Sequence, residues 1–281
     1  MRSPVPYGPR RADRRTATVM FSVLLLAVWA GAVLTALAGP LIAPVLGLPD
    51  PAEPVARPFT APGPGHPLGT DRVGRDVLAR LCTGNTVLVI PPALAAAAST
   101  ISGAAVGLTA ALCPRLRPWI RFLTDTLLVI PPTIMLLAVI SANGVGLPGV
   151  TLMAVILSLP LSSRYLEAAA KPVVSSGYVE VRRATGIPFP VVVIGDVLPA
   201  MRRALFADLG VRYVGVVFLT ATAAFLGATV GTGTRTWASM VPEAFAGLAL
   251  NPWAAAAPVL LIIALTAPPA ILIDIVNGGG R

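Results

Sequence analysis

Residues 19–38, VMFSVLLLAVWAGAVLTALA, contain no charged side chain. A helix rises about 1.5 Å per residue, so this run extends over about 30 Å, the thickness of the hydrocarbon core of a bilayer. The Ala-Leu-Ala at its end is like a signal-peptide cleavage site, but the apolar run is longer than a signal peptide normally has. The sequence therefore predicts a retained transmembrane helix.

Five further apolar runs predict five further spans. They lie at residues 86–112, 122–142, 150–170, 207–230 and 253–276. The chain is 56% hydrophobic and 12% charged, whereas soluble domains carry about 25% charged residues. This composition excludes one large soluble domain. The expected fold class is an all-α polytopic membrane protein with six transmembrane helices.

The expected organisation along the chain follows from these runs. Residues 1–18 form a disordered cytosolic tail, 19–38 the first transmembrane helix, 39–84 an extracytosolic loop, 85–276 a five-helix core with a cytosolic loop at 171–206, and 277–281 a cytosolic tail. No soluble domain and no repeat of 20–50 residues is visible in the sequence.

The basic residues predict how the chain is oriented. The N-terminal tail, the 113–121 loop, the 164–212 region and Arg281 together hold 16 of the 21 basic residues. The segments on the other side hold Arg57, Arg72, Arg75, Arg80 and Arg235. Cytosolic loops carry the excess of Lys and Arg, so both termini are expected in the cytosol. The arginines flank apolar runs and form no aromatic-interleaved stripe, which argues against nucleic acid as a partner.

Motifs for catalysis are missing. The only lysine, Lys171, precedes Pro172, so there is no phosphate-binding loop of the G-x-x-x-x-G-K-[ST] type. The single histidine, His66, cannot build a metal site alone, and Cys82 and Cys113 have no Cys or His beside them. A helix between the two cysteines would hold them about 45 Å apart, too far for a disulfide. We therefore expect no enzyme activity, no metal and no catalytic residue, with any energy source on another polypeptide.

Four acidic residues fall near the expected cytosolic ends of spans. These are Asp125, Glu167, Asp208 and Asp274, and we expect them to act as interfacial anchors. Asp208 and Arg212 are spaced i,i+4, and Arg164 and Glu167 i,i+3, so each pair can meet on one helix face. The span centres are expected to be free of charge, which argues against an ion-coupled carrier.

The stretch GYVEVRRATGIPFPVVVIGDVLP, residues 177–199, is a polar interruption of this apolar chain. Gly177 can cap a helix, and Glu180 falls in its first turn, where a carboxylate suits the positive helix end. Gly186 is placed as a left-handed stop, and Pro188 and Pro190 prevent continuation. The sequence predicts a helix of about two turns, which is too short to be stable without packing against something else.

This stretch resembles the cytoplasmic loop of bacterial ABC-importer permeases. That pattern is Glu-Ala-Ala, three residues, Gly, nine residues, then Ile-x-Leu-Pro, and Glu180, Gly186 and Leu198-Pro199 stand at its fixed positions. Val181 and Arg182 replace the two alanines. Asp196 replaces the isoleucine.

Two further segments resemble the C-type permease of dipeptide and oligopeptide importers. HPLGTDRVGRDVLARL, residues 66–81, is similar to that family's His-Pro-Leu-Gly-Thr-Asp-x-x-Gly-Arg-Asp-Val signature. FLGATVGTGTRTW, residues 225–237, is similar to its Phe-Leu-Gly…Trp segment. The Gly-x-Arg-x-Ser that usually follows the signature keeps Gly84 but has Thr86 and Leu88 in place of Arg and Ser.

The resemblance implies a type I ABC-importer permease in a bacterial inner membrane. Its implied partners are a homologous B-type permease, one or two ABC ATPases, an extracytosolic substrate-binding protein and the lipid bilayer. ATP and Mg would be bound by the ATPases and no cofactor by this chain. The short helix would be a coupling helix that docks on an ATPase, and the implied coupling-loop residues are Tyr178, Glu180, Arg182, Arg183, Ala184, Gly186, Leu198 and Pro199.

The signature is expected to shape an extracytosolic turn and helix start rather than to bind substrate. Its residues are His66, Gly69, Thr70, Asp71, Gly74, Arg75 and Asp76. No substrate-binding residue is assigned. The implied cargo is a di- or oligopeptide, and nickel, haem, an opine or a sugar are alternatives for the same machine. A non-transporting membrane scaffold or sensor, and a stand-alone secondary carrier or membrane enzyme, are alternatives of a different class.

Overall fold

The computed structural model describes residues 11–83, 85–141, 146–226 and 236–278. Within these ranges the chain is helical apart from turns and three isolated β-bridges. The elements in chain order are α1 (Arg11–Val45), α2 (Val77–Cys82), η1 (Thr86–Leu88), α3 (Ile90–Leu112), α4 (Arg117–Val129), α5 (Pro132–Ser141), α6 (Gly146–Val174), α7 (Gly177–Ala184), α8 (Phe189–Val192), η2 (Val193–Val197), α9 (Leu198–Ala200), α10 (Arg202–Phe225), α11 (Trp237–Ala244), η3 (Phe245–Gly247) and α12 (Trp253–Gly278).

Five helices in the described residues are long and apolar enough to cross a membrane. They cover Thr18–Val45, Thr86–Leu112, Pro148–Val174, Arg202–Phe225 and Trp253–Ile275. These correspond to five of the six runs expected from the sequence, and the all-helical fold class is confirmed.

The expected third span, 122–142, is not one helix. It is divided into α4 and α5, because Ile130 is extended and Pro131-Pro132 follows it. A residue before proline is disfavoured in the helical conformation, and proline itself donates no backbone hydrogen bond. Residues 142–145 lie outside the described part of the chain.

Several element boundaries differ from those expected. α1 begins at Arg11, so residues 11–18 are helical rather than a disordered tail, and it continues beyond residue 38 through Pro40 and Pro44. Arg and Ala are good helix formers, which explains why the helix extends past the apolar run. The segment between α6 and α10 is shorter than 171–206 and consists mostly of short helices.

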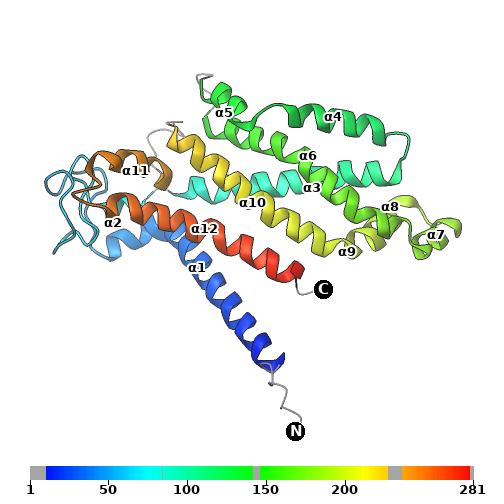
Figure 1. Ribbon diagram of the computed structural model, residues 1–281, viewed down its shortest axis with the longest axis horizontal. Coiled ribbons are helices and arrows are strands. Elements are labelled where there is room, and N and C mark those ends of the chain that lie inside the picture. The colour runs from blue at the N-terminus through cyan, green and yellow to red at the C-terminus, as the bar shows by residue number, and fades with distance from the viewer. Residues whose placement is uncertain (1–10, 84, 142–145, 227–235, 279–281) are drawn as a thin grey trace, which may run out of the picture.

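Figure 1 shows where the connecting segments gather. The loop after α1, together with α2 and α11, lies at one end of the bundle, and α7, α8 and α9 lie at the opposite end. The long helices α3, α6, α10 and α12 run between these two ends. The two segments singled out from the sequence, 66–81 and 177–199, are therefore at opposite ends of the molecule.

Helices α3 and α6 pack closely because α3 carries two glycines, Gly103 and Gly107, one turn apart. A Cβ added to Gly107 would lie 2.5 Å from the Ser163 carbonyl oxygen and 2.8 Å from the Glu167 backbone nitrogen. A Cβ on Gly103 would collide with the Ser162 side chain. Small residues at this spacing let membrane helices approach through their backbones. The close approach fixes α6, the helix that leads into α7.

Candidate functional site

A buried valine holds the short helix α7 to the bundle. Val179 is 2% exposed and packs in a cluster with Leu108 of α3, Leu166 of α6 and Val192 of α8. The carbonyl of Ser176 accepts the backbone N–H of Glu180 at 3.2 Å, so Ser176 rather than Gly177 provides the first helical bond. A helix this short gains its stability from such packing, as its length predicts.

The other face of α7 points away from the bundle. Tyr178 is 61% exposed, Val181 is 63% exposed, and Glu180 and Ala184 are exposed as well. Glu180 is in the first turn, and Gly186 has a φ of +77°, the left-handed conformation expected for the residue that ends the helix. The helix thus presents a small mixed surface of aromatic, aliphatic and acidic side chains.

The departures from the permease pattern pair with one another. The Nε of Arg182 donates to Oδ2 of Asp196 at 3.1 Å, and the Tyr178 hydroxyl donates to Oδ1 of the same carboxylate at 3.1 Å. The Arg182 guanidinium also lies 5.9 Å from the centre of the Tyr178 ring. Arg182 and Asp196 therefore compensate each other, and they join α7 to η2 across the loop. We call Tyr178, Arg182 and Asp196 the loop clamp.

The remaining expected loop residues occupy different positions. Leu198 is half-buried against the cluster that holds Val179, and Pro199 is exposed at the start of α9. Arg183 lies in α7, and its side chain is outside the described part. The structure brings Tyr178 and Arg182 together with Asp196, the residue that replaces the isoleucine of the permease pattern.

A double-mutant cycle on Arg182 and Asp196 should measure the clamp. We expect Arg182→Ala and Asp196→Ala each to lower thermal stability slightly, and the double variant to lose less than their sum. The coupling should be about 0.2–1 kcal/mol, because both side chains are partly solvated. Scanning calorimetry of the purified chain in detergent measures it, and strictly additive losses would show that the pair is not coupled.

At the opposite end, the signature segment is tied to the loop before α12. The Asn251 side-chain amide donates to the carbonyls of Leu68 and Thr70 at 3.0 and 3.1 Å. Gly69 has a φ of +70°, and a Cβ there would collide with the Thr60 carbonyl oxygen and the Asn251 amide. The Thr70 hydroxyl donates to the Arg57 carbonyl at 2.7 Å. Gly69 and Thr70 therefore shape this loop.

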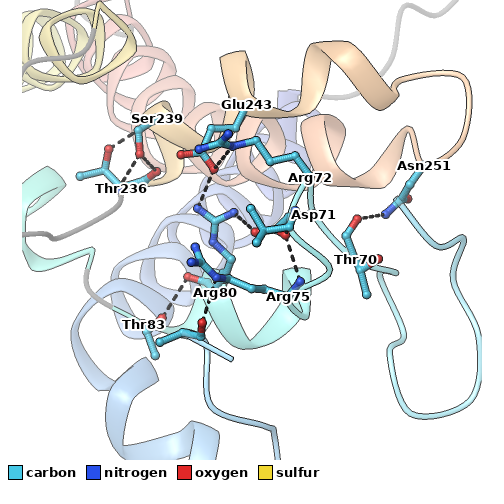
Figure 2. Close-up of polar contacts among 12 residues, drawn as sticks. Thr70, Asp71, Arg72, Arg75, Arg80, Thr83, Thr236, Ser239, Glu243 and Asn251 are labelled. Carbon is cyan, nitrogen blue, oxygen red and sulfur yellow. Dashed lines mark hydrogen bonds and ion pairs between the residues drawn. The ribbon is translucent and has the colours of Figure 1, made fainter. Parts of the chain in front are cut away.

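Asp71 organises a turn and a buried ion pair at once. Its Oδ1 accepts the backbone N–H groups of Val73 and Arg75 at 2.7 and 2.9 Å. Its Oδ2 lies 2.5 Å from Nη1 of Arg80, whose Nη2 lies 3.1 Å from Oε2 of Glu243 in α11. Figure 2 shows Arg80 between these two carboxylates. Asp71, Arg80 and Glu243 form what we call the Arg80 bridge.

The other signature residues also support the loop. Asp76 caps α2, accepting the Ala79 N–H at 2.7 Å, and it is fully buried. Gly74 has a φ of +87°, where a Cβ would collide with the Ala56 carbonyl oxygen. Arg75 Nε donates to the Ala52 carbonyl at 3.0 Å. The backbone of His66 closes a turn with Gly63.

Sequence reasoning missed the residues that anchor this segment to distant helices. They are Arg80, Asn85, Trp237, Glu243 and Asn251. The Trp237 backbone N–H donates to the Asn85 side chain and its ring N–H to the Leu81 carbonyl, both at 2.9 Å. Trp237 ends the 225–237 segment, whose residues 227–235 lie outside the described part of the chain. In the sequence, the one indication that residues 66–81 and 225–237 are in contact is that both segments resemble the same family.

Two expectations about charged residues near the membrane are wrong. Arg164 pairs with Asp125 rather than Glu167, because α4 places that carboxylate against α6. Asp208 is buried rather than an interfacial anchor: it is 2% exposed and accepts hydrogen bonds from Thr100 and Ser162, near the middles of two other apolar helices. The expected Asp208–Arg212 pair is confirmed, with Nε to Oδ1 at 3.3 Å.

Both cysteines are free thiols. Cys82 is buried, and burial, followed by the nearby Asp76 carboxylate, raises the pKa of its thiol. Cys113 is exposed in the turn between α3 and α4. Among the described residues, no group of three or more His, Cys, Asp or Glu could hold a metal ion.

The helical bundle carries the signature segment at one end and α7 at the other. The comparison with family models shows which family the chain belongs to. The model described as "binding-protein-dependent transport system inner membrane component" matches residues 103–279. The chain belongs to this family. The described helices that are apolar enough to span a membrane agree with an inner membrane component of a transport system.

Relatives of this inner membrane component are permeases. The chain is 29% identical over 242 residues to a putative peptide transport system permease protein of Brucella suis, covering 86% of this chain and 79% of the relative. It is 29% identical over 197 residues to the di/tripeptide transport system permease protein DppC of Pseudomonas aeruginosa, covering 70% of this chain and 65% of the relative. A chain in an inward-facing structure of the MetNI methionine ABC transporter is similar with a TM-score of 0.49 and 17% identity, covering 67% of this chain and 94% of that chain.

Proposed function

We propose that this chain is the translocation subunit of an ATP-driven importer of di- and oligopeptides. The observation that carries the proposal is the family match over residues 103–279, a range that contains α7. The relatives in Brucella suis and Pseudomonas aeruginosa are both named as peptide permeases, which supports a peptide cargo. The chain forms the pathway together with a homologous B-type permease.

In this proposal the energy comes from other subunits. One or two ABC ATPases bind ATP and Mg, and this chain binds neither. An extracytosolic binding protein delivers the peptide. The family description, which makes transport dependent on a binding protein, supports that partner.

The exposed face of α7 is the proposed contact with an ATPase. Val179 packs against the bundle, so the exposed side chains of Glu180 and Val181 can enter a groove on the partner. The exposed ring of Tyr178 lies on the same helix and is held in place by its hydrogen bond to Asp196. The loop clamp joins α7 to η2, and α9 leads from there directly into α10. A displacement of α7 is therefore passed to α6 on one side and to α10 on the other.

Cross-linking tests the proposed contact. In a Cys113→Ser background, a Val181→Cys chain labelled with benzophenone maleimide should form a cross-link to the ATPase when the assembled importer is irradiated, because the benzophenone inserts into C–H bonds of whatever chain lies against it. Val73→Cys, an exposed valine at the other end of the molecule, is the matched control and should not cross-link to it. Equal cross-linking from both positions, or none from Val181→Cys in an active importer, would show that α7 does not contact the ATPase.

The proposed topology has six crossings with both termini in the cytosol. α4 and α5 together supply the crossing that neither makes alone. Cys113 follows α3 and would then face the cytosol.

A membrane-impermeant maleimide should therefore label Cys113 in permeabilised cells and not in intact ones. Cys82 should react slowly in both, because it is buried and its raised pKa lowers the thiolate fraction. Cys113→Ser is the control for assigning the label. Labelling of Cys113 in intact cells would show that the chain has the opposite orientation in the membrane.

A further inference from the structure

A polar pocket of about 340 Å³ lies between α4 and α6, away from both segments discussed above. It is lined by Arg121, Asp125, Arg164, Glu167, Ala168 and Lys171. A water molecule takes about 30 Å³ in the liquid, so the pocket can admit a polar group much larger than water.

Three cations converge on one carboxylate oxygen in this region. Oε1 of Glu167 lies 3.1 Å from Nη2 of Arg121, 3.2 Å from Nζ of Lys171 and 3.3 Å from Nε of Arg117. The Glu167 side chain is 6% exposed, whereas those of Arg121 and Lys171 are 49% and 43% exposed. The carboxylate is thus at the base of the group, and the cations extend outward from it.

The pocket carries an excess of positive charge. Asp125 forms an ion pair with Arg164, and Glu167 is shared among the other three cations. Three basic side chains and two carboxylates line the pocket, and Arg117 beside it also contacts Glu167, so the group as a whole has a net charge of +2. An arginine has five N–H donors, so a guanidinium that contacts Glu167 can still donate to a second anion.

The pocket lies next to exposed apolar side chains of α4. Three side chains on α4, Trp119, Phe122 and Leu123, are 72%, 69% and 63% exposed. Arg121 and Asp125, one turn apart, line the pocket between α4 and α6. In the proposed topology the start of α4 and the last turns of α6, which carry Arg121 and Lys171, are both near the cytosolic ends of membrane crossings. Long basic side chains near the ends of membrane-spanning helices extend to the interface. The basic pocket is then at the depth of the lipid head groups.

We propose that this pocket binds the phosphate of an anionic phospholipid head group. Arginine and lysine are suited to phosphate oxygens, and basic pockets between membrane helices at this depth bind such head groups. Arg121 and Lys171 contact the phosphate, and the exposed apolar side chains of α4 lie along the acyl chains. The inference depends neither on the peptide cargo nor on the ATPase contact.

The test is a binding measurement on the purified full chain in a neutral detergent, with fluorescent phosphatidylglycerol as the probe. Phosphatidylcholine, which has no net charge, is the lipid control. Arg121→Gln/Lys171→Gln should weaken phosphatidylglycerol binding by about 30-fold, the effect expected for losing two interfacial cations. Arg115→Gln/Arg203→Gln is the matched control, because it removes the same charge at exposed positions outside the pocket. It should leave the affinity nearly unchanged.

A gain-of-binding variant covers the case in which the double variant fails to fold. Asp125→Asn changes an exposed carboxylate, leaves Arg164 unpaired and raises the net charge to +3. It should tighten phosphatidylglycerol binding by about fivefold.

Four results would overturn the proposal. They are equal weakening by the two double variants, equal affinity for both lipids, no gain from Asp125→Asn, and displacement of the lipid by inorganic phosphate at the same concentration. The last would assign the pocket to free phosphate.

Discussion

An Arg80→Ala chain is expected to lose about 3–5 kcal/mol of folding stability and to accumulate poorly in the membrane. Arg80 is 4% exposed and lies between Asp71 and Glu243. Removing one partner from a buried ion pair leaves an uncompensated charge, which costs far more than the pair itself contributes. Because single domains are stable by about 5–15 kcal/mol, such a loss is a large part of the total.

Arg72→Ala is the matched control for this prediction. Arg72 is also near Glu243, at 3.7 Å, but its side chain is 51% exposed. Its loss should cost no more than about 1 kcal/mol. Arg80→Lys should fall between the two, since one ammonium cannot replace the two contacts of the guanidinium. The thermal midpoint of the detergent-solubilised chain measures all three, and similar midpoints for Arg80→Ala and Arg72→Ala would contradict the buried role of the Arg80 bridge.

Glu180→Lys and Gly186→Asp should each abolish coupled peptide uptake while leaving the chain folded. Glu180 is exposed in the first turn of α7, so reversing its charge costs the helix only about 0.3–1 kcal/mol. Gly186 has open space around it, and Asp tolerates its left-handed conformation at about 1–2 kcal/mol. A central interface residue contributes about 2 kcal/mol or more, so ATPase binding should weaken by about 30-fold or more.

The readout is ATP-driven uptake of a labelled dipeptide, together with the amount of chain in the membrane. Glu53→Lys, the same exchange at an exposed position in the loop after α1, is the control and should not reduce uptake. Normal uptake by Glu180→Lys and Gly186→Asp would show that α7 does not couple the two subunits.

The elements that could be predicted are those whose signals are local in the sequence. Uncharged runs give the long helices directly, since a bilayer requires a fixed length of apolar helix. The end of α7 had a local sign, because Gly186 can adopt the left-handed conformation and Pro188 and Pro190 donate no backbone hydrogen bond. The division of α4 from α5 had a local sign too, in Pro131-Pro132.

The parts that were missed depend on contacts between residues far apart in the chain. Arg80 and Glu243 are 163 positions apart, and Thr100 and Asp208 are 108 apart. No spacing rule connects such pairs, so the sequence predicts an interfacial anchor at Asp208 and not its buried hydrogen bonds to Thr100 and Ser162. Asp196 departs from the permease pattern at its own position, and its partner Arg182 is on another helix. A pattern read one residue at a time does not show that two unusual residues, such as Arg182 and Asp196, pair with each other.

Peptide uptake in a defined system tests the central claim most directly. The B-type permease, the ATPases and the binding protein are reconstituted into liposomes with and without this chain, and ATP-dependent entry of a labelled dipeptide is measured. We predict entry only when this chain and ATP are both present, and background entry when Glu180→Lys replaces it. Equal entry without the chain, or no entry by the complete wild-type assembly while it hydrolyses ATP in response to loaded binding protein, would contradict the account.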